Sequence, residues 1–299
     1  MHKTVLLQEA IDGLNLDDGR TVVDATFGGG GHSAEICRKF PKIKIIALDQ
    51  DNGVWERARG KLENCNISFH NANFRDLDKV LEKDSLSRNI DGIIFDLGLS
   101  SDQLEDSGRG FSFMKDEPLI MTMKENPRRE DITAEDVVNT WSEESLADII
   151  YGYGEERLAR KIARAIVEAR REKEIKTSFD LVKIIKSAVP AVYQRGRIHF
   201  ATRTFQAIRI AVNDELSTLS EGLDKGFRFL KNGGRLSVIT FHSLEDRIVK
   251  KFFKNKEKNG EARIINKKVI LPSTEEIKNN TRSRSAKLRI LEKITALAG

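Results

Sequence analysis

The 299-residue sequence is poor in cysteine and has no long apolar run. Its two cysteines, Cys37 and Cys65, are too few and too isolated for a disulfide framework or a structural zinc site, so we expect a reduced, cytoplasmic protein without a metal. No stretch reaches the about 18 apolar residues that a membrane-spanning helix needs. The first residues, Met1–Thr4, lead into an amphipathic segment and not into a signal-peptide core.

Positive charge is concentrated in two segments, although the formal net charge is only +5. Residues 157–197 hold 12 Lys and Arg against 4 Asp and Glu, a local +8. Residues 247–289 hold 14 against 4, a local +10. Clustered cations favour a polyanionic partner, because binding to phosphates releases counterions. A pair of solvated basic helices is the alternative interpretation.

Short apolar runs alternate with helix-like segments in the first hundred residues. The runs occupy residues 21–25, 43–48, 67–70 and 91–95. This alternation predicts βαβ units and a parallel sheet. Three runs end at a carboxylate, namely Asp24, Asp49 and Asp96. Since ligands of open α/β sheets bind at the carboxyl ends of the strands, we expect these three side chains to gather there.

A helical block interrupts this pattern before strands return. Residues 133–188 show helical signals only, with a helix start at Thr133. One long helix is predicted over 205–230, ended by Gly233-Gly234 and followed by strands at 235–241, 262–270 and 286–294. We therefore predict an α/β fold with a seven-stranded, mostly parallel sheet. Its domains would be residues 1–105 and 203–299, with an inserted helical subdomain at 106–202.

A glycine run follows the first strand. Gly28–Gly31 lets the backbone approach a ligand closely, and the helix that begins there offers free N–H groups to a carboxylate. The Walker ending is absent, so a nucleoside triphosphate is not expected. Asp49, 19 positions after Gly30, could accept both ribose hydroxyls of NAD or of S-adenosylmethionine. A plain tight turn and a helix-capping Asp49 remain the alternatives.

Asp96 stands where amino-group methyltransferases place a carboxylate or amide. The exocyclic amine of cytosine is a poor nucleophile because its lone pair is delocalised into the ring. A hydrogen-bond acceptor can turn that lone pair toward a sulfonium methyl group, and in-line positioning supplies much of the rate. Asp96 could act in this way or contact the cofactor; alternatively it caps the following turn.

Eight segments together resemble one known family. The chain resembles the bacterial small-subunit ribosomal RNA methyltransferase H family, which methylates the N4 amine of a cytidine in the decoding region. The matching segments span nearly the whole chain: HKTVLLQE (2–9), DATFGGGGHS (24–33), DGIIFDLGLSSDQ (91–103), RGFSF (109–113), YGEER (153–157), HFATRTFQAIRIAVNDEL (199–216), TFHSLEDRIVK (240–250) and RSRSAKLR (282–289).

The resemblance implies a class I, Rossmann-like S-adenosylmethionine-dependent methyltransferase domain with a helical insertion. Its substrate would be 16S rRNA, within an assembling 30S subunit, and it leaves open whether the chain forms a homodimer. Phe74 follows the third strand, where it could lie against an adenine or belong to the core, and the resemblance favours the adenine contact. The resemblance also implies contacts of His32 and Gln103 that spacing alone does not assign. The implied cofactor-binding residues are Gly30, Gly31, His32, Asp49, Phe74, Asp96 and Gln103.

Other motifs suit an RNA substrate. Arg109, Phe111 and Phe113 could supply a cation and stacking faces for an unstacked base, although two alternate Phe residues also suit a buried strand. His242 could relay the proton lost from the amine or could be structural.

Basic residues near the carboxyl end provide candidate phosphate contacts, with solvated charge as the alternative. The residues selected are Arg247, Arg282 and Arg284.

One segment departs from the family pattern. Where the family usually reads Leu-Asp-Met-Arg-Met-Asp, residues 119–124 read Leu-Ile-Met-Thr-Met-Lys. This difference motivates an alternative function, an S-adenosylmethionine-binding RNA-binding protein with altered target or reduced catalysis. An NAD-dependent oxidoreductase, supported only by the glycine run and Asp49, and a methyltransferase of DNA or another RNA are further alternatives.

Overall fold

The computed structural model describes residues 4–83, 89–100, 103–104, 107–125 and 127–295. Parts of two motifs, His2 and Lys3 in one and Ser101 and Asp102 in the other, lie outside the described residues. The chain divides into two compact units: residues 1–98 with 216–299, and residues 99–215. The second unit therefore begins before and ends after the expected insertion at 106–202.

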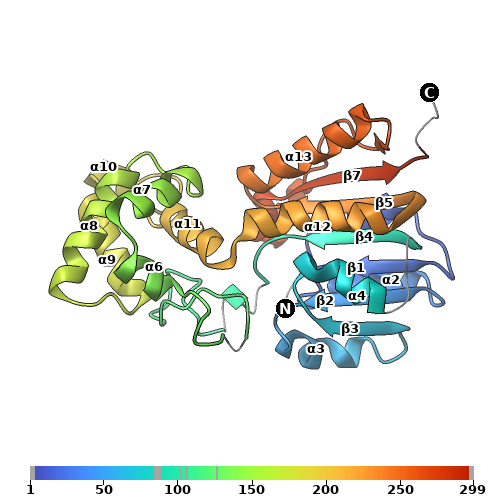
Figure 1. The fold of residues 1–299 in the computed structure, drawn as a ribbon, viewed down its shortest axis with the longest axis horizontal. Helices are drawn as coiled ribbons and strands as arrows, with labels where there is room; N and C mark the ends of the chain where they lie inside the picture. Colours follow the sequence, from blue (N-terminus) through green and yellow to red (C-terminus); the bar gives the residue numbers. More distant parts are fainter. Residues whose placement is uncertain (1–3, 84–88, 101–102, 105–106, 126, 296–299) are drawn as a thin grey trace. The chain divides into compact units, whose positions relative to one another are not determined.

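The first unit contains a seven-stranded sheet with the order β3-β2-β1-β4-β5-β7-β6 (Figure 1). β7 pairs antiparallel with β5 and with β6, and the other pairings are parallel. This confirms the expected α/β fold class. The strands are β1 (Thr21–Asp24), β2 (Lys44–Asp49), β3 (Ile67–Asn71), β4 (Ile90–Asp96), β5 (Leu230–Thr240), β6 (Ala262–Ile264) and β7 (Lys287–Lys293).

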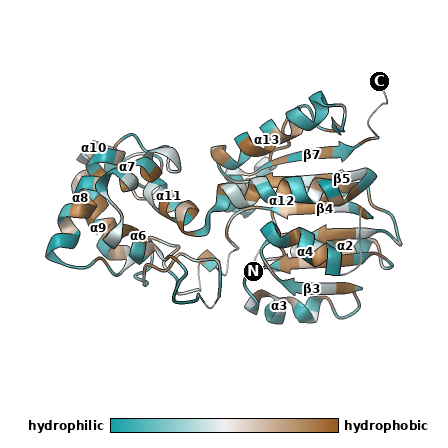
Figure 2. Ribbon diagram, viewed as in Figure 1, coloured by the Kyte–Doolittle hydropathy of each residue, from teal (hydrophilic) through white to brown (hydrophobic). Residues whose placement is uncertain are grey.

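Helices cover both faces of this sheet. Successive strand residues point to opposite faces, so Val22 packs with α1 and α2, whereas Val23 packs with α4, α12 and α13. Figure 2 shows brown, apolar residues along the central strands β1 and β2 and both brown and teal residues on the helices. The helices of this unit are α1 (Leu7–Leu14), α2 (Gly31–Lys39), α3 (Gly53–Ala58), α4 (Leu77–Lys83), α12 (Glu215–Phe229), α13 (Ser243–Lys258), α14 (Thr274–Asn279), and the 3-10 turns η1 (Arg59–Lys61), η2 (Phe74–Asp76) and η3 (Thr281–Ser285).

The strand order places a switch point between β1 and β4. The chain leaves β1 toward β2 on one side and returns to β4 on the other side. Ligands of open α/β sheets bind in the crevice outside the strand ends at such a point. Asp24 is the last residue of β1, and Asp96 is the last residue of β4.

The second unit is helical and has its own apolar core. Thr133 caps the helix that begins at Ala134, through a capping box in which Asp136 is the partner, and the sequence predicts this helix start. The core gathers fully buried residues such as Leu146, Ile162 and Ile185. Its helices are α6 (Ala134–Thr140), α7 (Glu143–Gly152), α8 (Ala159–Glu172), α9 (Ser178–Ala188), α10 (Ala191–Gln194) and α11 (Thr202–Asn213).

The long helix predicted over 205–230 is wrong in one respect. Asp214 adopts a left-handed conformation, with φ 46° and ψ 44°, and separates α11 from α12. The apolar period continues across this break because both helices bury one face, so the period does not reveal it. Gly233 and Gly234, predicted to end that helix, lie within β5.

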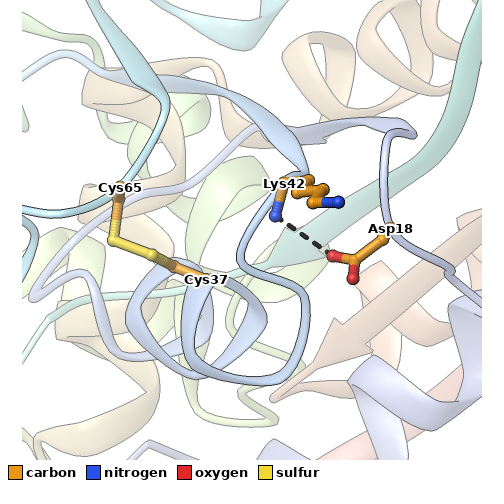
Figure 3. The surroundings of a disulfide bond; sticks show 4 residues. All are labelled: Asp18, Cys37, Lys42 and Cys65. Atoms are coloured by element: carbon orange, nitrogen blue, oxygen red, sulfur yellow. Dashed lines mark hydrogen bonds between the residues drawn. A yellow bond between two sulfur atoms is a disulfide. The ribbon is translucent and has the colours of Figure 1, made fainter.

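The two cysteines form a disulfide bond, contrary to the expectation from their isolation. Cys37 on α2 and Cys65 just before β3 have Cα atoms 5.7 Å apart (Figure 3). Close by, the backbone N–H of Lys42 donates to Oδ1 of Asp18 at 3.1 Å (Figure 3). The parallel packing of β1, β2 and β3 joins segments that are distant in sequence, which cysteine spacing does not show.

Within the described ranges, no helix is both long and apolar enough to cross a membrane.

Candidate active site

The glycine run forms a tight loop between β1 and α2. Gly28 and Gly30 have positive φ angles of 49° and 70°, which glycine adopts without strain. A Cβ atom on Gly30 would lie 2.8 Å from the Phe27 ring, and one on Gly31 would collide with the Thr4 hydroxyl. The loop therefore requires glycine for both conformation and space.

Asp24, the last residue of β1, holds this loop through hydrogen bonds. Its side chain is 1% exposed and accepts a hydrogen bond from the Ser33 hydroxyl at 2.6 Å and one from the Thr26 N–H at 3.3 Å. Burial raises the pKa of Asp24 to about 6. Ser33 lies in the first turn of α2, so Asp24 ties the end of β1 to the start of that helix.

Asp49, at the end of the neighbouring strand β2, binds the backbone of the glycine loop. Its Oδ2 accepts the N–H of Gly28 at 2.8 Å, and its Oδ1 accepts the N–H of Asp51 at 2.9 Å. Burial raises the pKa of Asp49 to about 6, although both N–H groups favour the charged form. The Gln50 backbone N–H also favours the charged form. A carboxylate has about four lone-pair sites, so Asp49 keeps acceptor capacity for the ribose of a ligand.

Asp96 lies at the adjacent strand end with one oxygen unsatisfied. Its N–H donates to the Thr26 hydroxyl at 2.6 Å, and its Oδ2 is 3.7 Å from Nδ1 of His32. Its Oδ1 is buried without a hydrogen-bond partner among the described residues. Burial, with Asp24 and Glu245 nearby, holds the pKa of Asp96 well above its usual range.

These three carboxylates suit a ligand that brings positive charge and hydrogen-bond donors. Buried carboxylates with raised pKa values are destabilised in the charged form, and a cation or N–H group beside them offsets that cost. Oδ1 of Asp96, which has no hydrogen-bond partner among the described residues, can accept a hydrogen bond from such a donor. The arrangement therefore fits a nucleoside with a cationic centre, with its ribose at Asp49.

Phe74 lies in η2 and packs edge-on against Phe95, with ring centroids 5.5 Å apart. It is partly buried against the core of the first unit and also faces Gly222, where a Cβ atom would lie 2.5 Å from its ring. Phe74 thus has a structural role in the core. Its contact with an adenine stays a prediction.

Gln103 belongs to the second unit and is 7% exposed. Its side-chain oxygen accepts the N–H of Ser100 at 3.0 Å, and its own N–H donates to the Ser100 hydroxyl at 3.1 Å. Gln103 therefore organises the turn that follows the Asp96 strand. Its cofactor contact stays a prediction.

Of the three residues proposed to hold a base, two face inward within the second unit. Arg109 is 8% exposed and donates through Nη1 to the carbonyls of Thr122, Met123 and Lys124 at 3.2, 3.2 and 2.9 Å. Phe111 is 6% exposed in the apolar core. This favours burial over base stacking for these two residues, although residues 107–113 form no strand.

Phe113 is only partly buried and lies in an aromatic cluster. Its ring stacks on His199 at 4.5 Å between centroids and at 4° between planes, and Phe205 meets it edge-on. The sequence does not indicate a function for His199, since no partner residue at a motif-like distance accompanies this single His after a basic run. A base-stacking role of Phe113 stays a prediction.

His242 caps α13, which favours its structural interpretation. Its side chain accepts the N–H of Glu245, and Glu245 accepts the N–H groups of Phe241 and His242 at 2.8 and 3.2 Å. The position of Glu245 after the fifth strand predicts that it lies near the crevice, but the sequence assigned no role to Glu245, Thr26 or Ser33. A polar residue three positions after His242 is the capping-box signal that could have indicated it.

The three selected arginines near the carboxyl end lie in the first unit. Arg247 on α13 and Arg284 in η3 are exposed, and Arg282 is partly buried. Their contact with phosphates stays a prediction.

The divergent segment 119–124 is integrated into the second unit. Thr122 is 4% exposed, and Lys124 pairs with Asp131. The Asn213 side chain accepts the Met123 N–H and donates to the Met121 carbonyl, both at 2.8 Å. The segment is therefore held by its backbone and does not depend on the charges that the family usually has there.

Comparison with known proteins assigns the family. The model of the MraW methylase family matches residues 1–294. The chain belongs to the MraW methylase family. A ribosomal RNA small subunit methyltransferase H from Clostridium botulinum (strain Kyoto / Type A2) is 48% identical over 98% of this chain and 99% of its own length. One with the same name from Lactobacillus johnsonii is 43% identical over the same shares. A solved rRNA methylase from Streptococcus thermophilus covers 99% of each chain at 14% identity with a TM-score of 0.47.

Proposed function

We propose that this methylase transfers a methyl group from S-adenosylmethionine to the N4 amine of a cytidine in the decoding region of 16S rRNA. The carboxylate group of Asp24, Asp49 and Asp96 at the switch point carries the proposal, because it suits a cationic nucleoside cofactor. The names of the relatives support the choice of small-subunit ribosomal RNA as the substrate.

Each part of the crevice has a role in binding this cofactor. The N–H groups of Gly31 and His32, at the start of α2, would hold its methionine carboxylate. Gly30, whose own N–H donates to the Phe27 carbonyl at 2.8 Å, would let the backbone lie close to the cofactor. Asp49 would accept its ribose hydroxyls, and Phe74 would lie against its adenine. The bound cofactor supplies an electrophilic methyl group on a sulfonium.

Asp96 would orient the attacking amine and take its proton. Its Oδ1 has a free acceptor position, so it can accept an N–H of the exocyclic amine and turn the lone pair toward the methyl group. The new N–C bond forms as the S–C bond breaks, and the S–C electron pair remains on sulfur. The amine proton can pass to Oδ1 of the ionised carboxylate, which has no hydrogen-bond partner among the described residues.

The setting follows from the substrate. A protein that modifies small-subunit rRNA acts in the cytoplasm, on an assembling 30S subunit, and binds RNA. The alternative is a cofactor-binding RNA-binding protein with altered target or reduced catalysis. The reason is that Ile120 and Thr122 are uncharged where the family usually has charged residues.

The test is transfer of a tritiated methyl group from S-adenosylmethionine to small subunits that lack the modification, followed by nucleoside analysis. We expect labelled N4-methylcytidine. Asp96→Asn should lower turnover by about 100-fold or more, the usual contribution of a positioned acid or base. Asp17→Asn, at an exposed carboxylate paired with Arg20, is the matched control. Cofactor binding without transfer would support the alternative, and near-normal turnover of Asp96→Asn would remove Asp96 from the mechanism.

A further inference from the structure

α13 has one apolar face and one strongly basic face. Val249 and Phe253 are 0% and 1% exposed and pack in the core of the first unit. On the outer face, Lys250, Lys251 and Lys254 are all exposed. None of these three lysines forms an ion pair with any described residue. Their charges are therefore available to a partner.

The acidic side chains of α13 form ion pairs or hydrogen bonds with other parts of the first unit. Asp246 binds Arg289 at 2.7 Å and Lys287 at 3.3 Å, both on β7. Glu257 accepts the N–H of Ile264 on β6 at 3.0 Å. The pairing of Asp246 with two β7 cations removes a carboxylate that would otherwise compete for the exposed lysines.

Not every lysine of α13 is available in this way. Lys256 points toward the core, where it binds Glu261 at 3.0 Å and lies 4.6 Å from the centre of the Phe227 ring. The structure thus distinguishes Lys256, which stabilises the fold, from the three lysines that face outward, although the sequence presents them as one run. Lys258, the last residue of α13, is also exposed.

The spacing of the outward lysines suits a regular polyanion. A helix rises 1.5 Å per residue, so Lys250 and Lys254 are displaced by about 6 Å along α13. They lie on the same side because residues four apart are neighbours on a helix surface. A displacement of this size is comparable with the separation of successive phosphates along one nucleic-acid strand.

α8 is the competing basic surface, and its charge is mixed. Its exposed Glu168 and Glu172 interrupt the cations, and Arg164 pairs with Glu143 at 3.6 Å. Arg170 donates to the carbonyls of Val138 and Trp141 at 2.9 and 2.7 Å and so holds the second unit together. Charge complementarity with a phosphate backbone therefore favours α13.

We propose that Lys250, Lys251 and Lys254 form a phosphate track that holds the backbone of the substrate RNA, separately from the residues that hold the reacting base. This rests on the proposed function for the identity of the RNA. The track is independent of base sequence, because ammonium groups read charge and not base edges. It would contribute to RNA affinity and leave the chemical step unchanged.

The experiment compares two triple variants with the same loss of charge. One carries Lys250→Gln, Lys251→Gln and Lys254→Gln; the control carries Arg160→Gln, Lys161→Gln and Arg171→Gln at exposed positions of α8. Binding to in-vitro-transcribed small-subunit rRNA is measured over a range of salt concentrations. We expect the α13 variant to bind at least tenfold more weakly, with the slope of log K against log salt reduced by about 2, or roughly 0.7 for each lost contact. The control should change both much less.

Further measurements separate this proposal from its alternatives. S-adenosylhomocysteine affinity should be unchanged in both variants, which shows that the first unit is folded. With small subunits, KM should rise in the α13 variant while kcat is retained. An unchanged salt slope, or an equal loss in the control, would overturn the track. Weaker binding to assembled subunits but not to protein-free rRNA would assign the lysines to a ribosomal protein instead. RNA binding requires no turnover, so failure of methyl transfer alone would contradict the proposed function and not the track.

Discussion

The raised pKa of Asp49 predicts that cofactor affinity depends on pH in a range where most carboxylates are already ionised. In the free protein, burial brings this pKa to about 6. A protonated carboxyl group cannot accept two ribose hydroxyls and also keep its bonds to Gly28 and Asp51. We therefore expect the cofactor to bind only the ionised form.

The size of the effect follows from linkage. With a pKa of about 6, Asp49 is about nine-tenths ionised at pH 7 and about one-tenth ionised at pH 5. The dissociation constant should therefore rise by about tenfold between pH 7 and pH 5. Protonation of Asp49 between pH 7 and pH 5 does not lower the free energy of unfolding. A raised pKa means that the folded chain binds this proton more tightly than the unfolded chain does.

The assay is titration calorimetry with S-adenosylhomocysteine from pH 5 to pH 8, with circular dichroism at each pH to show that the protein is folded. Asp49→Asn should bind more weakly at pH 7 and should lose the pH step. Asp17→Asn, at an exposed carboxylate paired with Arg20, serves as the control and should keep the pH step. A flat profile in the wild type, or a step that persists in Asp49→Asn, would refute the reasoning.

Two further predictions concern stability. Reduction of the Cys37–Cys65 bond, which closes a separation of 28 residues, should lower the free energy of unfolding by about 3.6 kcal/mol on the chain-entropy model. Denaturant unfolding with and without reductant measures this loss of stability. The double variant Cys37→Ser, Cys65→Ser is the control and should not respond to reductant. Identical unfolding midpoints of the wild type under both conditions would contradict the prediction. Glu156 is 0% exposed and accepts the Tyr193 hydroxyl at 2.6 Å and the Leu158 N–H at 2.8 Å. Glu156→Ala should therefore destabilise the second unit by about 3 kcal/mol, since it leaves buried donors unpaired. Tyr193→Phe should cost about 1 kcal/mol, and an unfolding free energy of Glu156→Ala close to that of the wild type would show that these bonds contribute little.

Local sequence patterns predicted the sheet and the position of its crevice. Apolar runs that stop at Asp24, Asp49 and Asp96 identify strand ends, and parallel strands bring those ends to one edge. Gly28 and Gly30 were recognisable because a positive φ restricts residue choice. These signals depend on a residue and its close neighbours along the chain.

The roles of individual side chains were harder to predict. The motif around Arg109 and Phe111 suggested an RNA contact, yet both residues are buried in the second unit, where Arg109 binds the carbonyls of 122–124. Similarly, the basic run in α13 does not reveal that Lys256 is internal while Lys254 is exposed. The helical period predicts only approximately which residues face the core. The residue that pairs with a given cation lies elsewhere in the chain, so the period does not indicate it.

The sequence by itself determined the α/β architecture, the glycine loop and the three strand-end carboxylates, because each depends on short-range periodicity and on backbone conformation. Only the tertiary structure decided that Cys37 pairs with Cys65, that Ser33 holds Asp24 and that Asp214 divides one apolar period into two helices. The same structure leaves Oδ1 of Asp96 buried without a partner among the residues described. The physical reason is that these features arise where packed elements bring distant groups into contact, and burial then sets which hydrogen bonds and charges each group can keep.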